Sequence, residues 1–244
     1  MIQHRKRDPL RGRNSFRDSD LFGETPTPFP DIVLSYNPVL YFALNETGSQ
    51  NPVDSSTTAA SASLNEPYTW NSLGPIPGKH SLDLSGGNFT IGRVGLTGSQ
   101  TRIAFVKLTA TDSVPAYEGD APLTVIGDTT ALAWDSFGVS NGKVSFSRFN
   151  NSTWQSFTGT RTVNDGAWHM IAATYDSVTR TVSLYVDGLA DGDGVVSAHQ
   201  VQGGIDVFGR GYNAADNYVG SLAELIVFNT ALSFEDIATI WYAS

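Results

Sequence analysis

The segment Gly138-Val139-Ser140-Asn141-Gly142 has the residue types and spacing that come nearest to a catalytic motif. Its G-x-S-x-G pattern matches the turn that exposes the nucleophilic serine of many hydrolases, which needs a strand before the serine and a helix after it. Here Asn141-Gly142 favours a two-residue hairpin turn, and the following residues 143–146 are strand-like. We therefore predict that Ser140 lies beside a hairpin turn and is not a nucleophile.

Other groups that could do chemistry are scattered along the chain. The histidines, at positions 4, 80, 169 and 199, show neither H-x-H nor H-E-x-x-H spacing, so they give no support to a zinc site. The chain has no cysteine, which excludes disulfides and thiolate metal sites. We predict no catalytic residue and no required cofactor.

Aromatic side chains offer a different chemistry, because a flat ring presents an apolar platform to the CH face of a sugar. Trp70 and Trp154 lie among polar residues, and so do three tyrosines, Tyr68, Tyr212 and Tyr218. These five residues are the candidate ligand-binding residues, with burial in the core or in an interface as the alternative for each. The remaining tryptophans, Trp134, Trp168 and Trp241, lie in apolar patterns and are expected in the core.

The elements that must position these side chains are short strands. Residues 181–186 alternate apolar and polar side chains after the strand-like run 168–176, and Asp187-Gly188 then supplies a turn. Ser233 and Asp236 form the pattern of a capping box before a short terminal helix. Further strands are expected at 39–46, 78–91, 101–109, 122–127, 131–138, 143–149, 154–160, 205–209 and 220–229.

Four blocks, in order, resemble laminin-G-like and concanavalin A-like lectin domains. They are Y-F-A-L-N-E-T followed by D-S-S at 41–56, the glycine-turn block 78–91, the hairpin that opens with Trp168 and closes with L-Y-V-D-G at 184–188, and the last strand 220–229. The resemblance implies an all-β, antiparallel two-sheet jelly-roll sandwich with an extended N-terminal arm and a short C-terminal helix. It implies a binding or structural module before it implies an enzyme.

Glycosidases of this fold type resemble one another in an E-x-D-x-E triplet on one strand, since a retaining enzyme needs two carboxylates about 5 Å apart. The chain lacks this triplet, and Glu224 has Leu222 and Ile226 as same-face neighbours. The resemblance also implies at most one structural Ca²⁺, for which oxygen ligands are suitable. Its candidate ligands are left open: Glu46, Asp54, Glu224, Asp187, Asp191 and Asp193, the last three alternatively forming a solvated glycine-rich turn.

Charge divides the chain into an arm, residues 1–30, and a sandwich domain, residues 31–244. The arm has a net charge of +2 and the domain a net charge of −11, which argues against nucleic-acid binding. The arm ends in the Pro-rich run 25–30, which favours extended backbone. We expect it to dock on a neighbouring subunit, so that deleting residues 1–30 leaves a folded sandwich; its basic residues are Arg5, Lys6, Arg7, Arg11, Arg13 and Arg17.

The functional prediction follows from these features together. The basic start of the chain is not followed by the apolar segment of a secretory signal, and no run of roughly 20 apolar residues could span a membrane. We predict a non-catalytic virion protein, a bacteriophage minor tail, fibre or head-decoration subunit made in the host cytoplasm. It would join other virion subunits through its arm, assemble in multiple copies and adhere to a host-surface glycan. The alternatives are a glycan-binding adhesion module of a bacterial surface protein and, third, a glycoside hydrolase.

Overall fold

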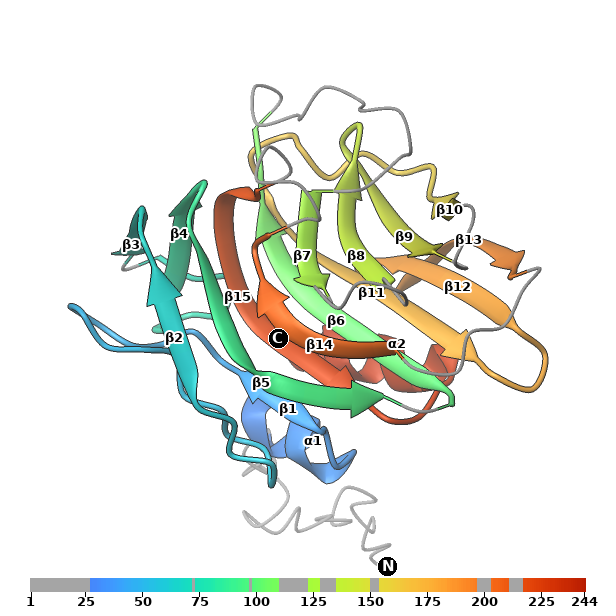
Figure 1. The fold of residues 1–244 in the computed structure, drawn as a ribbon, viewed down its shortest axis with the longest axis horizontal. Helices are drawn as coiled ribbons and strands as arrows, with labels where there is room; N and C mark the ends of the chain where they lie inside the picture. The colour runs from blue at the N-terminus through green and yellow to red at the C-terminus, as the bar shows by residue number, and fades with distance from the viewer. Residues whose placement is uncertain are drawn as a thin grey trace, which may run out of the picture.

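The protein is a β-sandwich with two short helices on one side (Figure 1). The computed structural model describes residues 27–71, 73–96, 98–109, 123–127, 135–149, 154–196, 203–210 and 217–244. Its helices are α1 (Phe29–Ser35) and α2 (Phe234–Tyr242). Its strands are β1 (Leu40–Phe42), β2 (Ala62–Asn65), β3 (Tyr68–Asn71), β4 (Ser81–Ser85), β5 (Asn88–Leu96), β6 (Gln100–Lys107), β7 (Leu123–Gly127), β8 (Asp135–Ser140), β9 (Lys143–Phe149), β10 (Trp154–Thr158), β11 (Trp168–Asp176), β12 (Thr181–Val186), β13 (Leu189–Val195), β14 (Gly203–Phe208) and β15 (Val219–Phe228).

The strands form two antiparallel sheets. The front sheet, nearer the viewer in Figure 1, has the order β10-β9-β8-β7-β14-β5-β2. The back sheet has the order β13-β12-β11-β6-β15-β4-β3, and β1 pairs with the second half of β15. Strands distant in sequence are neighbours in both sheets, as β6 lies between β11 and β15. The all-β jelly-roll sandwich predicted from the sequence is confirmed.

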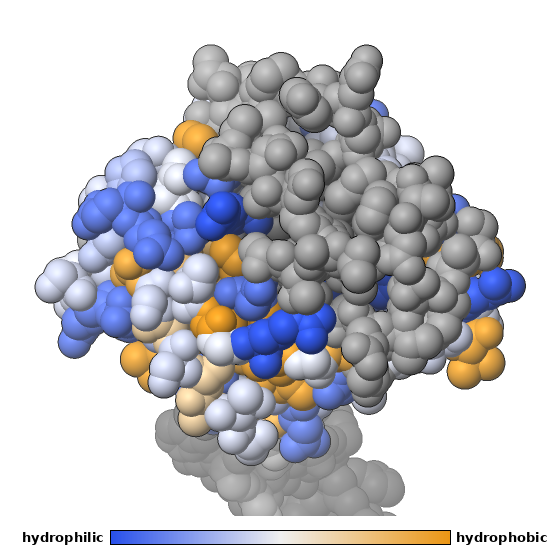
Figure 2. All heavy atoms as spheres, viewed as in Figure 1, coloured by the Kyte–Doolittle hydropathy of each residue, from blue (hydrophilic) through white to orange (hydrophobic). Residues whose placement is uncertain are grey.

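The main core fills the space between the sheets. Phe89 of β5 stacks on Phe208 of β14 with ring centroids 4.5 Å apart, and Phe42 of β1 packs edge-on against both rings at 5.3 Å. All three side chains are wholly buried. On the face shown in Figure 2, the described surface mixes hydrophilic and hydrophobic residues in small groups. The large apolar surface of the strands is therefore used mainly to hold the two sheets together.

A second apolar layer covers the outer face of the back sheet, under α1 and α2. Its buried members include Phe29 and Val33 of α1, Phe105 of β6, and Ile237 and Ile240 of α2. The terminal helix is confirmed, and Ser233 and Asp236 form the predicted capping box. The two helices thus close a sheet face that would otherwise expose apolar side chains.

Helix α1 starts two residues before the boundary that the sequence suggested between arm and domain. Phe29 and Pro30, expected in the extended arm, are the first residues of α1. Proline is tolerated in the first helical turn because its missing N–H would have no helical partner there. The Phe29 ring packs edge-on against Phe105, with centroids 5.9 Å apart. The six basic arm residues, between positions 5 and 17, lie outside the described residues.

The turn at Asn141-Gly142 has the predicted hairpin geometry. Both residues have positive φ, +49° and +73°, and they join β8 directly to β9. Ser140 is the last residue of β8, and a strand follows the turn where a nucleophile elbow would need a helix. The G-x-S-x-G match is therefore a consequence of turn chemistry.

Candidate functional site

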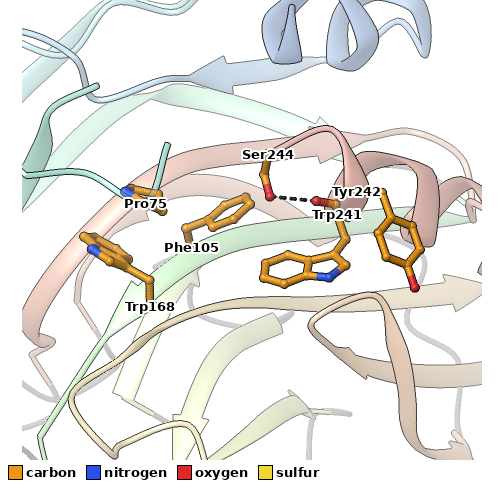
Figure 3. A pocket seen from close by; sticks show the side chains of 6 residues that line it. All are labelled: Pro75, Phe105, Trp168, Trp241, Tyr242 and Ser244. Atoms are coloured by element: carbon orange, nitrogen blue, oxygen red, sulfur yellow. Dashed lines mark hydrogen bonds between the residues drawn. The ribbon is translucent and has the colours of Figure 1, made fainter. Parts of the chain in front are cut away.

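A pocket lies on the outer face of the back sheet, beside the last turn of α2 (Figure 3). Its volume is about 390 Å³. Most of its wall is aromatic, and the residues come from the β3–β4 connection, β6, β11 and the C-terminal end of the chain: Pro75, Phe105, Trp168, Trp241, Tyr242 and Ser244. The pocket is thus formed by residues that are far apart in the sequence.

Phe105 lies between the two tryptophans, with Trp168 and Pro75 on one side of it and Trp241 on the other (Figure 3). The Trp241 ring is stacked near Phe105, with centroids 6.2 Å apart and an interplanar angle of 25°. Trp168 and Trp241 are both half-buried, whereas Tyr242 is 78% exposed. Each indole ring is therefore partly packed and partly accessible to a ligand.

The main chain at the end of α2 is tied down by the last residue. The Ser244 hydroxyl donates to the carbonyl of Trp241 at 2.6 Å, and the Ser244 amide donates to the same carbonyl at 3.1 Å. These bonds satisfy a carbonyl that the helix leaves without a helical partner. They hold the aromatic pair Trp241 and Tyr242 at the pocket.

A histidine clamp holds the strand that carries Trp168. The adjacent His169 places Nδ1 at 2.8 Å from Asp187 Oδ2 and Nε2 at 3.1 Å from Asp165 Oδ1. Burial by itself lowers the pKa of His169, but the hydrogen bonds to Asp187 and Asp165 outweigh it and the pKa is raised. The imidazolium, which donates from both nitrogens, is thus the form this geometry favours.

Asp187, which binds His169, belongs to the β12–β13 turn. Asp187 Oδ1 also accepts from the amide of Met170 at 2.9 Å, and the next residue, Gly188, lies against Trp241. The turn therefore contacts both β11 and α2, the elements that carry the two tryptophans of the pocket. Trp168 and Trp241 are positioned by one connected piece of structure.

Of the aromatic residues predicted to bind ligand, Tyr218 is buried, and Tyr68 and Trp70 are partly buried against the core. Tyr68 and Trp70 of β3 pack against the core between the sheets, and the buried indole nitrogen of Trp70 has no hydrogen-bond partner among the described residues. Tyr218 is fully buried and its hydroxyl donates to the carbonyl of Ser221 at 3.0 Å. The expectation for Tyr218 is wrong, because its ring has no exposed face. The side chain of Trp154 and the whole of Tyr212 lie outside the described part of the structure.

The pocket instead uses Trp168 and Trp241, which the sequence assigned to the core. Both alternate with core residues, so periodicity alone does not separate them from buried side chains. Their position at the ends of secondary-structure elements could have indicated their exposure. Trp168 is the first residue of β11, shortly after the polar segment 164–166, and Trp241 is in the last turn of α2. Residues at element ends meet solvent more often than residues at element centres.

Glu224 is a wholly buried carboxylate in the middle of β15. It has a φ of +49° at a register shift between Ala223 and Ile226, and its Oε2 accepts from the hydroxyl of Tyr41 at 2.7 Å. Its Oε1 is buried and has no partner among the described residues. Burial is the main reason why the pKa of Glu224 is raised to about 7. The carboxylate serves as an internal acceptor for Tyr41 in the layer under the helices.

Several carboxylates proposed as calcium ligands instead accept hydrogen bonds from backbone amides of neighbouring loops and strands. Asp54 accepts from the amides of Tyr41, Ser56 and Ala60, at 2.9, 2.9 and 2.8 Å. Asp191 of β13 accepts from the amides of Thr160 and Arg161. Asp187 belongs to the histidine clamp, and Asp193 is exposed on β13. Within the described residues, no three histidine, aspartate or glutamate side chains group so as to hold a metal ion.

One further buried charge cluster joins the two sheets. Asp135 of β8 receives two hydrogen bonds from Arg148 of β9, at 2.6 and 2.5 Å, and lies 3.4 Å from Arg102 of β6. Burial opposes ionisation of Asp135, but the two arginines overcome it and hold the pKa of this carboxyl below its usual value. Since each carboxylate oxygen is already paired, the cluster fixes the sheets and offers no open site.

The chain is similar to known proteins in its sequence and in its fold. A model of the concanavalin A-like lectin/glucanases superfamily matches residues 83–238. "Sushi, von Willebrand factor type A, EGF and pentraxin domain-containing protein 1" is 32% identical over 96 residues in Rattus norvegicus and 33% over 93 residues in Mus musculus. These matches cover 35% and 34% of this chain but only 3% of each relative.

Solved structures share the fold at low sequence identity. The binding domain of Paraclostridial Mosquitocidal Protein 1 has a TM-score of 0.67 at 10% identity, covering 85% of this chain and 52% of that one. The binding domain of botulinum neurotoxin serotype G has a TM-score of 0.65 at 12% identity, covering 84% and 51%. Domain 4 of AbnA, an extracellular arabinanase of Geobacillus stearothermophilus solved with arabinotriose, has a TM-score of 0.62 at 14% identity, covering 84% and 98%. The chain thus spans about half of the toxin domains and nearly all of the arabinanase domain.

Neither helix in the described part of the chain is long and apolar enough to cross a membrane.

Proposed function

Because the chain belongs to the concanavalin A-like lectin/glucanases superfamily, we propose that it is a carbohydrate-binding module and that the sugar binds in the aromatic pocket beside α2. The observation that carries this proposal is the placement of Trp168 and Trp241 on either side of Phe105. Half-buried indole rings held by the surrounding fold provide the rigid apolar surface on which a sugar ring stacks.

The structural neighbours support a binding role of this kind. One of them, the arabinanase domain, was solved with an arabinotriose, and the two toxin neighbours are binding domains. We extend that role to this chain on the strength of the pocket.

A non-catalytic role is supported by the state of the residues that could do chemistry. Ser140 ends a strand at a hairpin, and the Glu224 carboxylate is wholly buried against the hydroxyl of Tyr41. Neither arrangement exposes an acid and a nucleophile to a bound sugar. We therefore propose recognition without hydrolysis.

An adhesion module of a surface protein accounts for the pocket, the family and the structural neighbours. A location in a virion, with a basic arm that docks on another subunit, stays a prediction from the sequence. In either setting single-site binding would be weak, since stacking contributes on the order of 1 kcal/mol per ring. Several copies on one particle would raise the avidity by roughly 10²–10⁴.

Glycan-array screening followed by calorimetric titration of the strongest ligand tests the proposal. Tyr242→Ala and Trp168→Ala should each weaken binding roughly fivefold, the equivalent of about 1 kcal/mol. The matched control is Phe234→Ala, an exposed aromatic of the same helix that stacks on Tyr185 and does not line the pocket.

The control should bind like the unaltered protein. A protein that binds no glycan on the array, or whose binding survives both pocket variants, would overturn the proposal. Loss of binding in Trp154→Ala with both pocket variants unaffected would move the site to the front sheet.

A further inference from the structure

A row of side chains crosses the outer face of the back sheet next to the pocket. The strand register pairs Trp168 with Lys107, Lys107 with Ser221, Ser221 with Asp83, and Asp83 with Thr69. Each residue is directly opposite the next, so the row runs straight across β11, β6, β15, β4 and β3. Trp168 belongs both to this row and to the pocket.

The side chains of the row point away from the sandwich interior. Their neighbours in sequence, Val106, Leu222, Leu84 and Trp70, pack in the core between the sheets, and successive side chains of a strand alternate between its two faces. Lys107 and Thr69 are exposed, Asp83 is half-buried, and Ser221, between Lys107 and Asp83, is buried. A ligand seated on Trp168 can therefore continue onto this row.

The polar groups of the row differ in whether they already have hydrogen-bond partners within the protein. The Ser221 hydroxyl donates to Asp83 Oδ2 at 3.1 Å, which fixes that carboxylate in the row. The ammonium group of Lys107 has no hydrogen bond or ion pair with any described residue. Among the described residues, Lys107 thus has no ion-pair partner, and it is directly opposite Trp168 in the strand register.

The length of the row sets the size of the ligand. Adjacent strands of a sheet lie about 4.8 Å apart, so Trp168 and Asp83 are separated by roughly 14 Å across three strand intervals. This distance exceeds the width of one sugar ring. A ligand that reaches from the pocket to Asp83 must be an oligosaccharide.

We propose that the site selects an acidic oligosaccharide, with an anionic substituent on Lys107, an adjacent sugar face on Trp168 and hydroxyls donating to Asp83. This inference rests on the glycan-binding function proposed above and names the class of glycan. The charge of the sandwich domain, −11 over residues 31–244, repels anions in general. Binding of an acidic oligosaccharide therefore needs a local positive charge, and Lys107 supplies this charge next to the stacking tryptophan.

Titration of matched tetrasaccharides tests the inference: a neutral hexose oligomer, the uronic-acid oligomer and a sulfated oligomer. We expect the unaltered protein to bind an acidic tetrasaccharide about tenfold more tightly than the neutral one. Lys107→Ala should remove this preference by weakening the acidic tetrasaccharide about tenfold. Lys143→Ala, on β9 of the front sheet, is the matched control and should keep the preference.

Comparison of the uronic-acid and sulfated oligomers shows which anion Lys107 takes, and a higher ionic strength should weaken the acidic ligand more than the neutral one. Equal affinity for neutral and acidic tetrasaccharides, or a preference that survives Lys107→Ala, would overturn the inference. In that case neutral binding that still depends on Tyr242 would leave the proposed function standing. A monosaccharide that binds as tightly as its tetrasaccharide would contradict the use of the row.

Discussion

Gly188 and Trp241 are in contact across the boundary between the β12–β13 turn and α2. A Cβ atom at position 188 would lie 2.8 Å from Trp241 Cδ1 and 3.0 Å from Trp241 Cβ. The φ of Gly188 is +71°, a conformation in which a side chain is strained. Glycine at this position thus permits both the turn and the close approach of the tryptophan that walls the pocket.

Gly188→Ala should therefore damage the pocket as well as the stability. The strained φ costs about 1 kcal/mol, and displacement of Trp241 should add a further ~1–3 kcal/mol. Chemical denaturation measures the stability and glycan titration the binding. Gly78→Ala is the matched control, because its φ is +76° and no atom lies within 4 Å of the added Cβ. Equal losses in the two variants would show that the contact with Trp241 contributes nothing.

Glu224 should make the protein less stable as the pH rises. Its pKa is about 7 in the folded protein, against an ordinary value of 4.5. Between these values the folded state holds a proton that the unfolded state has lost, so the free energy of unfolding falls as the pH rises, by on the order of 3 kcal/mol. Glu224→Gln stays neutral and can still accept from Tyr41. The stability advantage of this variant should grow from pH 4.5 to pH 7 in urea denaturation, and a constant difference between the two proteins would refute the prediction.

His169 should contribute a separate loss of stability at higher pH. Hydrogen bonds to Asp187 and Asp165 outweigh burial and raise its pKa, so the stabilisation is complete below the unfolded-state pKa near 6.5 and is lost as the pH rises through the folded-state pKa. The loss should stay below about 1 kcal/mol because solvent screens the pair with Asp165. Thermal melts of His169→Gln between pH 5.5 and pH 8.5 should lack this component. A variant with the same pH profile as the unaltered protein would exclude the clamp as its source.

Truncation should show where the sandwich domain begins. Removing residues 1–30 deletes Phe29, which is 4% exposed and packs on Phe105. Removing residues 1–26 keeps it. We expect the longer truncation to unfold about 3 kcal/mol more easily than the shorter one, in line with the loss of a buried phenylalanine. Differential scanning calorimetry of the two proteins measures this, and identical melting temperatures would place the boundary at Asp31 after all.

Local patterns in the sequence predicted much of the fold. Asn141-Gly142 and Asp187-Gly188 mark hairpin turns because only a few residue types accept positive φ at low cost. Ser233 and Asp236 mark the start of α2 because their side chains cap its free amides. Alternation in residues 181–186 marks β12. Each of these patterns involves residues that are close in sequence, so each can be recognised without the tertiary structure.

Other parts of the fold depended on contacts that local patterns do not record. The run 187–194 is expected from the sequence to be a glycine-rich turn or part of a calcium site. Most of it belongs to the edge strand β13 (Leu189–Val195), which pairs with β12 through a register shift near Gly192. Its glycines and aspartates disfavour a strand by propensity. Pairing with β12 and the anchoring of Asp191 by the 160–161 loop decide its conformation.

The candidate site shows the same division. The sequence by itself determined that the chain is an all-β sandwich with aromatic residues suited to sugars and without a carboxylate triplet for hydrolysis. It assigned Trp168 and Trp241 to the core, because an apolar residue in an apolar pattern has the same periodicity whether it faces a neighbour or a cavity. Only the tertiary structure brought these rings to Phe105 and aligned Lys107 with Trp168, since both depend on strand pairing and helix docking between residues far apart in the chain.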